Sequence, residues 1–464
     1  MGDISTGILI LLIICLVLAC AFEFVNGFHD TANAVATVIY TNSLKPTVAV
    51  IWSGLWNFIG VIAGGIGVAM GIVNLLPVEV LTDSSVSHGA AMIVALLVTA
   101  ILWNLGTWYL GLPASSSHTL IGSILGVGLA FYFINGKDAV NWGKAQEIGL
   151  ALLFSPLFGF AAAIFVMYVF KRLIKNEAIY KEPTPGVPPP LWIRAILTLT
   201  CTLVSFFHGS NDGQKGIGLV MLILIVFIPK DYVINPSQDI SVTYSQIKIV
   251  KETLNRSNAE RLTDGELGIY KNTNAILDNL LQITREKKTV SEIDPSLRFE
   301  LRKGIIIMSK NIDKLIKGKN LLLTLNEIKR IEEYSAKSKS ATDYSPNWVP
   351  IVISISLGLG TMIGWKRVVQ TVGEKIGKQN MSYAQGASAG LVAASTIGLS
   401  TGFGLPVSTT HVLSSGIAGT MVAKKGLKNL QKDTIRNILI AWILTLPVTM
   451  IISGGLFLLF RWLF

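Results

Sequence analysis

Two polar motifs lie inside long apolar runs of this chain. The first, Glu23–Asn33, places a glutamate, a histidine, an aspartate and two asparagines within eleven residues. An ionised aspartate at the centre of a membrane helix costs about 3 kcal/mol, so Asp30 is expected to face a cavity, a partner or an ion. Gly27 precedes it, and a break in the helix at this glycine would free backbone groups that can bind ions. We therefore expect a broken helix near Gly27.

The motif returns later in the chain. His208–Asp212 aligns with Asn26–Asp30, glycine with glycine and aspartate with aspartate, at a separation of 182 residues (212 − 30). Carboxylates inside a membrane indicate an ion cavity or a proton relay. Asp30 and Asp212 could coordinate Na⁺, hold a proton or pair with Lys215. The alternative is a buried ion pair that only stabilises the fold.

A second duplicated motif carries hydroxyl groups. Pro113-Ala-Ser-Ser-Ser-His118 matches Pro406-Val-Ser-Thr-Thr-His411, 293 residues later (411 − 118). Proline at the first helical position, followed by Ser or Thr, suits a helix start whose free N–H groups and positive dipole end favour an anion. Two such starts would form a donor pocket for a tetrahedral oxyanion, unless the hydroxyls only cap or bridge helices. The hydroxyl residues are Ser115, Ser116, Ser117, Ser408, Thr409 and Thr410.

The two separations indicate two homologous halves, with about 111 residues (293 − 182) inserted in the second. Polar motifs that interrupt apolar segments, and that occur once in each half of a chain, are typical of secondary transporters. Residues 230–346 hold 20 Lys/Arg and 16 Asp/Glu, against 19 and 12 in the other 347 positions (464 − 117), so we predict a soluble helical insert there. The first membrane repeat is predicted at 1–172, a basic, proline-rich linker at 173–190, and the second repeat at 191–229 and 347–464.

The predicted fold is an all-α polytopic membrane protein. It has two inverted homologous repeats with broken helices and Ser/Thr-rich hairpins, in addition to the insert. The expected spans are Ile8–Tyr40, 48–73, His88–Tyr109, Gly111–Phe133, Glu147–Phe170, Leu191–Ile228, Trp348–Gly364, Tyr383–Thr401, Gly404–Ala423 and Ile435–Leu463.

Charge in the loops predicts the orientation. Basic clusters at Lys171–Lys175, Lys366–Lys378 and Lys424–Lys432 are expected in the cytoplasm, and the Asn74–Ser87 loop, which has only Glu79 and Asp83, is expected outside. Five net crossings in each half satisfy these constraints and make the halves inverted copies. The same count places both termini and the insert outside the cytoplasm.

Composition excludes several functions. The net charge of +11 would indicate a nucleic-acid partner in a soluble protein, but the basic residues outside the insert lie in short loops, where membrane topology explains them. The three cysteines lie in apolar segments without metal-ligand spacing. There is no HExxH, CxxC or Walker motif, so we expect no fixed metal site, no cofactor, no ATP-driven transport and no enzymatic activity.

Four segments of the chain resemble the inorganic phosphate transporters of the PiT family, most like its bacterial low-affinity, proton-coupled branch. The segments are Asn26–Thr41, Gly111–Gly122, His208–Val220 and Gly404–His411. The resemblance implies symport of phosphate with protons, in this branch often as a neutral complex with Mg²⁺ or another divalent cation. It also implies a homodimer in the cytoplasmic (inner) membrane. It places the six hydroxyl residues on phosphate-binding hairpins, and the ion-binding motif on Asp30, Asn33, Asn211 and Asp212.

One departure from the family bears on the coupling ion. The sodium-coupled pattern is Gly-x-Asn-Asp-x-Ala-Asn in both halves, whereas the first copy here has His29 and the second ends in Gln214-Lys215. Lys215 stands where a sodium ligand is expected, which favours protons, and it can pair with Asp212 within one helical turn. Asp30, with Glu23 and His29 nearby, is then the candidate proton carrier.

The sequence is also compatible with other functions. A sodium-coupled phosphate symporter, or a permease for sulfate or another oxyanion, would use the same scaffold. A passive anion channel would be insensitive to uncouplers. A membrane enzyme would need an activated nucleophile or a metal.

Overall fold

The computed structural model describes residues 5–76, 86–136, 139–184, 186–257, 261–318 and 320–463. All the named elements in these ranges are helices. The chain divides into two compact units: Met1–Phe227 together with Pro346–Phe464, and Ile228–Ser345. We call them the membrane unit and the inserted unit. The loop residues Glu79 and Asp83 lie outside the described ranges.

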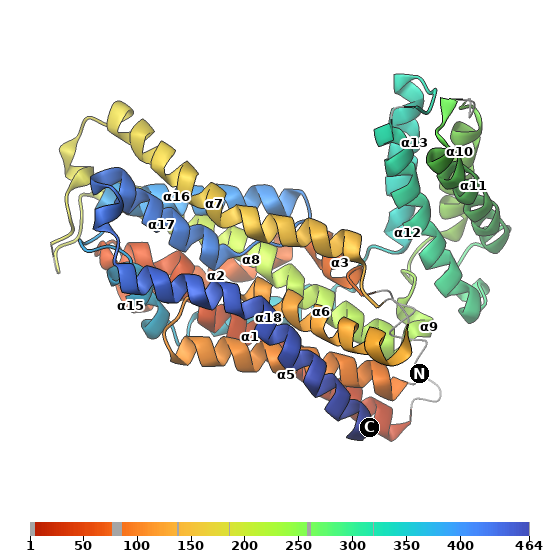
Figure 1. Cartoon of the computed structure of the whole chain (residues 1–464), viewed down its shortest axis with the longest axis horizontal. Coiled ribbons are helices and arrows are strands. Elements are labelled where there is room, and N and C mark those ends of the chain that lie inside the picture. The colour runs from red at the N-terminus through yellow and green to blue at the C-terminus, as the bar shows by residue number, and fades with distance from the viewer. Residues whose placement is uncertain are drawn as a thin grey trace. The chain divides into compact units, whose positions relative to one another are not determined.

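The membrane unit contains seven helices that are long and apolar enough to cross a bilayer, counted within the described ranges. The pair α14 and α15, bent by 66°, makes an eighth if the two form one span. Its helices are α1 (Thr6–Tyr40), α2 (Pro46–Ala63), α3 (Gly67–Val73), α5 (Val86–Tyr109), α6 (Ser116–Asn135), α7 (Trp142–Leu173), η1 (Glu177–Tyr180), α8 (Leu191–Phe227), α14 (Trp348–Thr361), α15 (Lys366–Glu374), α16 (Tyr383–Gly402), α17 (Thr409–Lys425), η5 (Leu427–Asn429) and α18 (Lys432–Leu463) (Figure 1).

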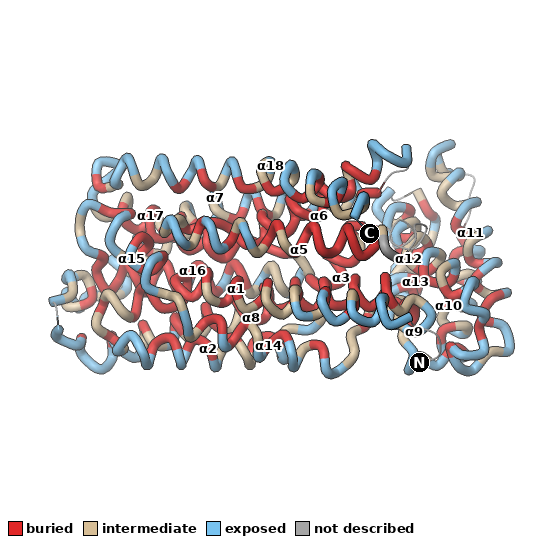
Figure 2. The backbone as a smooth tube through the Cα atoms, turned by 90° about the horizontal axis from the view of Figure 1, so that it is seen from below, coloured by how far each residue is buried: buried red, intermediate tan, exposed pale blue. Residues whose placement is uncertain are grey.

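The outer surface of this unit is apolar. Phe165 of α7 and Ile451 of α18 are 68% and 74% exposed, and many other large apolar side chains share these outer faces. Figure 2 shows exposed and buried residues alternating along α18, whereas α6 is buried along most of its length. Water disfavours a continuous exposed apolar surface, and the hydrocarbon of a bilayer accepts it. The unit is that of a multi-pass membrane protein.

The expected break at Gly27 is wrong, because α1 is continuous from Thr6 to Tyr40. Gly27 lies where α1 crosses α14, and a Cβ atom at this position would meet the Leu357 carbonyl oxygen and the Thr361 nitrogen. Thr31 Oγ1 donates to the carbonyls of Gly27 (2.6 Å) and Thr361 (2.9 Å), and so joins the two helices. This glycine permits close helix packing. The helix that carries Asp212, α8, is also continuous.

Breaks occur at other positions instead. The predicted span 48–73 is two helices, α2 and α3, and between them Gly65 has φ +74°, a left-handed conformation that glycine adopts without strain. Gln214 of α8 forms hydrogen bonds with the backbone groups that the interruption of the helix leaves without partners. Its Oε1 accepts from Val68 N (2.7 Å) and its Nε2 donates to Gly64 O (2.6 Å). Gly364, with φ +76°, lies at the corresponding bend between α14 and α15.

Each hydroxyl motif ends an extended segment and begins a helix. Ser115 is the N-cap of α6 and accepts from His118 N (3.2 Å), and Ser408 is the N-cap of α17 and accepts from His411 N (3.1 Å). Pro113 therefore precedes the helix. The expectation from the sequence that this proline occupies the first helical position is wrong. Because both caps are buried, the free N–H groups and positive dipole ends of α6 and α17 lie inside the bundle.

Helices from the first half of the chain pack against helices from the second half. α2 packs on α8 and α14 packs on α1, while α6 packs on α18 and α17 packs on α7. Asn42, just after α1, donates to the carbonyl of Thr184, just before α8 (3.1 Å). Since α1 and α8 also pack together, they run antiparallel. The two polar motifs therefore meet near the middle of the unit, from opposite directions.

The inserted unit is a small helical bundle. Its main helices bury apolar residues at three- and four-residue spacing, such as Ile305, Met308 and Ile312. Thr263 with Glu266, and Thr324 with Glu327, form capping boxes that begin two of them. The elements are α9 (Pro229–Tyr232), α10 (Ile240–Asn255), α11 (Asp264–Thr284), η3 (Val290–Glu292), α12 (Pro295–Gly318), α13 (Leu325–Ser338) and η4 (Lys339–Ala341).

Candidate functional site

Asp30 lies where both hydroxyl motifs converge. Ser116 Oγ donates to Asp30 Oδ2 (3.2 Å) and Thr410 Oγ1 donates to Asp30 Oδ1 (2.9 Å). His29 Nδ1 is 2.8 Å from Asp30 Oδ1. The carboxylate is 3% exposed, so these hydrogen bonds replace the water that it would otherwise hold. Residues 294 positions apart (410 − 116) thus bind one side chain.

The two hydroxyl motifs also bind each other. Ser117 Oγ donates to the Val407 carbonyl (2.6 Å), which joins the start of α6 to the segment before α17. Asn33 Nδ2, one turn beyond Asp30, donates to Thr410 Oγ1 (3.0 Å) and lies 3.4 Å from Thr409 Oγ1. The sequence predicted that the two hydroxyl clusters would come together, and the structure places them side by side.

The second carboxylate has a cation beside it. Lys215 Nζ is 2.6 Å from Asp212 Oδ2 and donates to Ser117 Oγ (2.6 Å), with the lysine side chain 1% exposed. The predicted ion pair within one helical turn is therefore present. His208 Nε2 lies between the two aspartates, 3.7 Å from Asp30 Oδ2 and 3.6 Å from Asp212 Oδ2. A single polar centre thus spans α1, α6, α8 and α17.

Several buried atoms of this centre lack a hydrogen-bond partner among the described residues. Among them are Asn33 Oδ1, His208 Nε2, Asp212 Oδ1 and His411 Nε2. A buried polar atom without a partner costs about 1–3 kcal/mol, so proteins rarely keep such atoms unless a ligand or water meets them. Their concentration beside the hydroxyl clusters makes this centre the candidate binding site.

Two predicted residues lie at its margin. Glu23 accepts from Asn26 Nδ2 (3.2 Å) and packs on Gly216, the residue after Lys215. Asn211 does not face Asp30: its Nδ2 donates to the Thr401 hydroxyl (3.0 Å) and the Leu405 carbonyl (3.1 Å). Asn211 therefore holds the segment before α17 in place.

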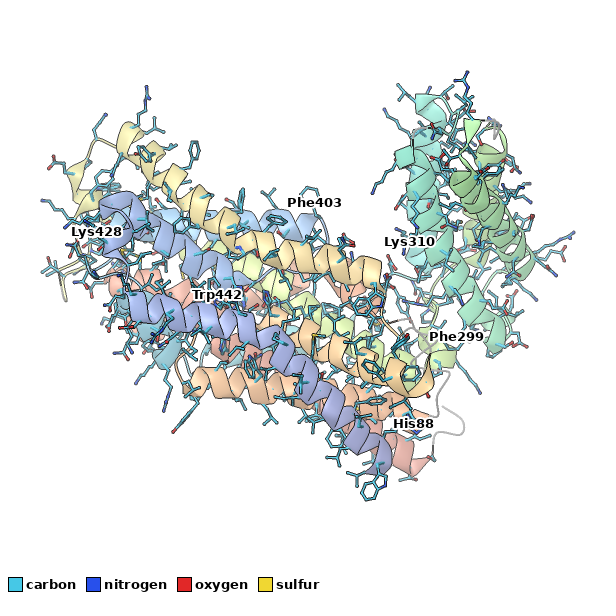
Figure 3. The ribbon with its side chains drawn as sticks, in the orientation of Figure 1. His88, Phe299, Lys310, Phe403, Lys428 and Trp442 are labelled. Atoms are coloured by element: carbon cyan, nitrogen blue, oxygen red, sulfur yellow. The ribbon has the colours of Figure 1, made fainter. Side chains whose placement is uncertain are left out.

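Two residues with clear roles were not predicted from the sequence. Trp442 of α18, labelled in Figure 3, donates from Nε1 to the Pro113 carbonyl (3.0 Å) and stacks on His411. Gln214 holds the break between α2 and α3. Of the two residues, only Gln214 could have been found from the sequence, because it departs from the motif that the two halves share. Nothing near Trp442 in the sequence indicates a partner more than 300 residues away.

The centre offers two kinds of chemistry. Hydroxyl donors and two helix N-termini suit a tetrahedral oxyanion. Asp30, His208 and Asp212 present ligand atoms within 4.8 Å of one another, which is close enough to hold a cation. Carboxylate oxygens suit hard divalent ions, and an imidazole also suits transition metals. An anion and a cation could therefore be bound side by side.

A multi-pass helical protein with a buried polar centre beside two helix starts has the architecture of a secondary transporter. The chain belongs to the Phosphate transporter family, whose model matches residues 26–453. It belongs to a family of transporters and not of enzymes.

Curated relatives align with this chain over almost their whole length. The low-affinity inorganic phosphate transporter PitA of Escherichia coli K12 is 40% identical over 490 aligned positions, covering 98% of this chain and 97% of the relative. A low-affinity inorganic phosphate transporter of Buchnera aphidicola subsp. Acyrthosiphon pisum is 39% identical, with the same coverage. A solved structure described as the sodium-dependent phosphate transporter has a TM-score of 0.55 at 18% identity, covering 98% of this chain and 100% of that one. The last similarity concerns the fold alone.

Proposed function

We propose that this protein imports inorganic phosphate by symport with protons, with the anion bound between the starts of α6 and α17. The observation that carries the proposal is the convergence of Ser116 and Thr410 on one buried carboxylate. The name of the 40%-identical relative, a low-affinity inorganic phosphate transporter, supports phosphate as the substrate. The phosphate-binding residues are Ser115, Ser116, Ser117, Ser408, Thr409 and Thr410.

Competition for the same donors links the proton to the substrate. While Asp30 is ionised, it accepts the hydroxyl protons of Ser116 and Thr410. Protonation of this carboxylate removes its charge and weakens both hydrogen bonds, since bonds to charged groups are about twice as strong. The two hydroxyls are then free to donate to phosphate. Loss of the proton on the other side of the membrane returns the donors to Asp30 and releases the anion.

Lys215 favours protons over sodium as the coupling ion. Its ammonium occupies the neighbourhood of Asp212 that a second cation would need, at 2.6 Å from Oδ2. Sodium coupling is the second candidate, because the structural neighbour described as sodium-dependent has the same fold. Asn33 and Asp30 remain as oxygen ligands for that case.

A divalent cation could accompany the phosphate. Asp30 and His208 are placed to meet such a cation beside the hydroxyl clusters, whereas Asp212 is already paired with Lys215. Bound phosphate would supply further oxygens, so the ion would travel as part of the substrate, and the protein need not hold it permanently. Mg²⁺ suits this arrangement because it is commonly held by one or two carboxylates together with phosphate oxygens.

The architecture supports two inverted repeats. α1 corresponds to α8, the broken pair α2/α3 to α14/α15, and α6 to α17, and each packs on the other half. We infer that the repeats alternate access by moving against each other around the central site. The family resemblance supports a homodimer in the cytoplasmic membrane, and the basic loops support termini and an inserted unit outside the cytoplasm.

Uptake by purified protein in proteoliposomes tests the function. Radiolabelled phosphate should accumulate under an inward proton gradient and should not accumulate when an uncoupler is added. Sulfate in tenfold excess should leave uptake unchanged if the site selects phosphate. Uptake that continues at full rate with the uncoupler, or equal competition by sulfate, contradicts the proposal.

A further inference from the structure

A cavity with several lysines in its wall lies far from the central site, where α7 and α17 finish. Figure 1 shows these two helix ends at the same end of the bundle. It has a volume of 440 Å³. Lysines from three elements line it: Lys171 in the last turn of α7, Lys181 after η1, and Lys424 near the end of α17. α17 starts at the central site and is 17 residues long, so the two sites lie about 25 Å apart at 1.5 Å per residue.

This cavity carries a small net positive charge. Its described lining residues include three lysines and one acidic side chain, Glu177, and a second carboxylate pairs with one of the lysines. Lys171 donates to the Ala423 carbonyl (3.4 Å) and Lys424 pairs with Glu182 (3.0 Å), which positions both ammonium groups. Lys181 forms no ion pair with any described residue, and so its charge is available to a ligand.

The remaining walls add polar groups and fix the shape. Tyr180 donates to the Ile174 carbonyl (3.0 Å), which folds η1 back against the end of α7. Ser382, the N-cap of α16, lines the cavity at the start of that helix. Three lysines and the start of a helix therefore line one concave surface, and such groups can bind a phosphate group.

The apolar surroundings favour a lipid as the source of the phosphate. Tyr168 and Leu173, on the outer face of α7 next to Lys171, are 69% and 73% exposed. Basic pockets between membrane helices bind anionic headgroups, and an exposed apolar helix face suits acyl chains.

We propose that this cavity, defined by Lys171, Lys181 and Lys424, binds the phosphate group of an anionic phospholipid and is separate from the transport site. The same chemistry would accept free phosphate, so the test separates the two sources. Binding is measured directly, and the result therefore does not depend on the proposed transport function.

The full chain in detergent is titrated with dioleoyl phosphatidylglycerol or dioleoyl phosphatidylcholine, and bound lipid is counted by native mass spectrometry. Phosphatidylglycerol should bind at least tenfold more tightly than phosphatidylcholine. The triple variant Lys171→Gln/Lys181→Gln/Lys424→Gln should lose that preference. A control triple, Lys375→Gln/Lys428→Gln/Lys432→Gln, removes the same charge from residues that do not line the cavity (Lys428 is labelled in Figure 3) and should keep it.

The single variant Lys181→Gln tests the site with little risk of misfolding, because this side chain is exposed and forms no ion pair with a described residue. It should weaken the binding of phosphatidylglycerol severalfold. Equal loss in both triples, or no preference in the unmodified protein, overturns the lipid site. A separate titration with inorganic phosphate uses a Ser116→Ala/Thr409→Ala background, in which the transport site is weakened. Phosphate binding there that depends on the three lysines, without a lipid preference, assigns the cavity to free phosphate and overturns the lipid as its source.

Discussion

The indole of Trp442 stacks on the imidazole of His411, with ring centroids 3.9 Å apart and 25° between the ring planes. The same indole donates to the Pro113 carbonyl (3.0 Å), in the segment before α6. His411 also lies 4.6 Å from His118, between ring centroids. One side chain of α18 therefore contacts the segments that carry both hydroxyl clusters, and it is placed to hold them in register.

Removing this contact should impair phosphate transport. Trp442→Phe keeps a stacking ring but removes the N–H donor, and a hydrogen bond contributes about 1 kcal/mol, or roughly fivefold in kcat/KM. Trp442→Ala also removes the stacking, which contributes about 0.5–1.5 kcal/mol, so its loss should be larger. Initial rates of phosphate uptake measure both. Trp462→Phe, in an exposed position at the end of α18, is the control. Wild-type kinetics in Trp442→Ala at equal membrane abundance would rule out the positioning role.

The donor pocket itself is tested at Ser116 and Thr409. Each alanine substitution should raise the apparent KM for phosphate, since a hydrogen bond to a charged group contributes roughly 1.5–3 kcal/mol, equivalent to about 10- to 150-fold. Ser123→Ala is a matched control, because its hydroxyl donates to the Thr119 carbonyl of its own helix (2.8 Å). If KM is unchanged in both pocket variants at equal abundance, phosphate binds elsewhere.

The side of the membrane on which the inserted unit lies can be measured with single cysteines. Lys310 is exposed on α12 (Figure 3), so Lys310→Cys in a background without the three native cysteines should react with an impermeant maleimide in intact cells or spheroplasts. Ser257→Cys should react slowly, because that position is buried. Lys428→Cys, expected on the cytoplasmic side, should react only after lysis. Labelling of Lys310→Cys only after lysis would mean that the predicted number of crossings before the insert is off by one.

The sequence predicts local relationships at this site better than it predicts helix continuity. The Lys215–Asp212 pair follows from their spacing of three residues on one helix, and the meeting of the hydroxyl clusters follows from their duplication. The predicted break at Gly27 is wrong because a glycine in an apolar segment can either break a helix or allow a second helix to pack closely. Which one applies depends on α14, which begins more than 300 residues later. The contacts of Trp442 are hidden for the same reason, since both its partners come from other parts of the chain.

Coupling should be to protons. Lys215 places a fixed cation beside Asp212 and donates to Ser117 (2.6 Å), so a sodium ion there would meet electrostatic repulsion. In proteoliposomes, phosphate uptake should follow an inward proton gradient. It should be unaffected by a sodium gradient at fixed pH and clamped voltage. Sodium-driven uptake by the unmodified protein would contradict this assignment.

The proton carrier is expected to be Asp30. Asp30→Asn keeps the size of the side chain and can still accept from one of Ser116 and Thr410, but an amide cannot gain and lose a proton as access alternates. Accumulation driven by the proton gradient should therefore be abolished, while exchange of labelled for unlabelled phosphate without a gradient should persist, because the donor pocket remains. Asp433→Asn, at the exposed start of α18, should change neither activity. Normal proton-driven accumulation by Asp30→Asn would show that another group carries the proton. Loss of exchange as well as accumulation would show that the Asp30 carboxylate is needed to build the phosphate site itself.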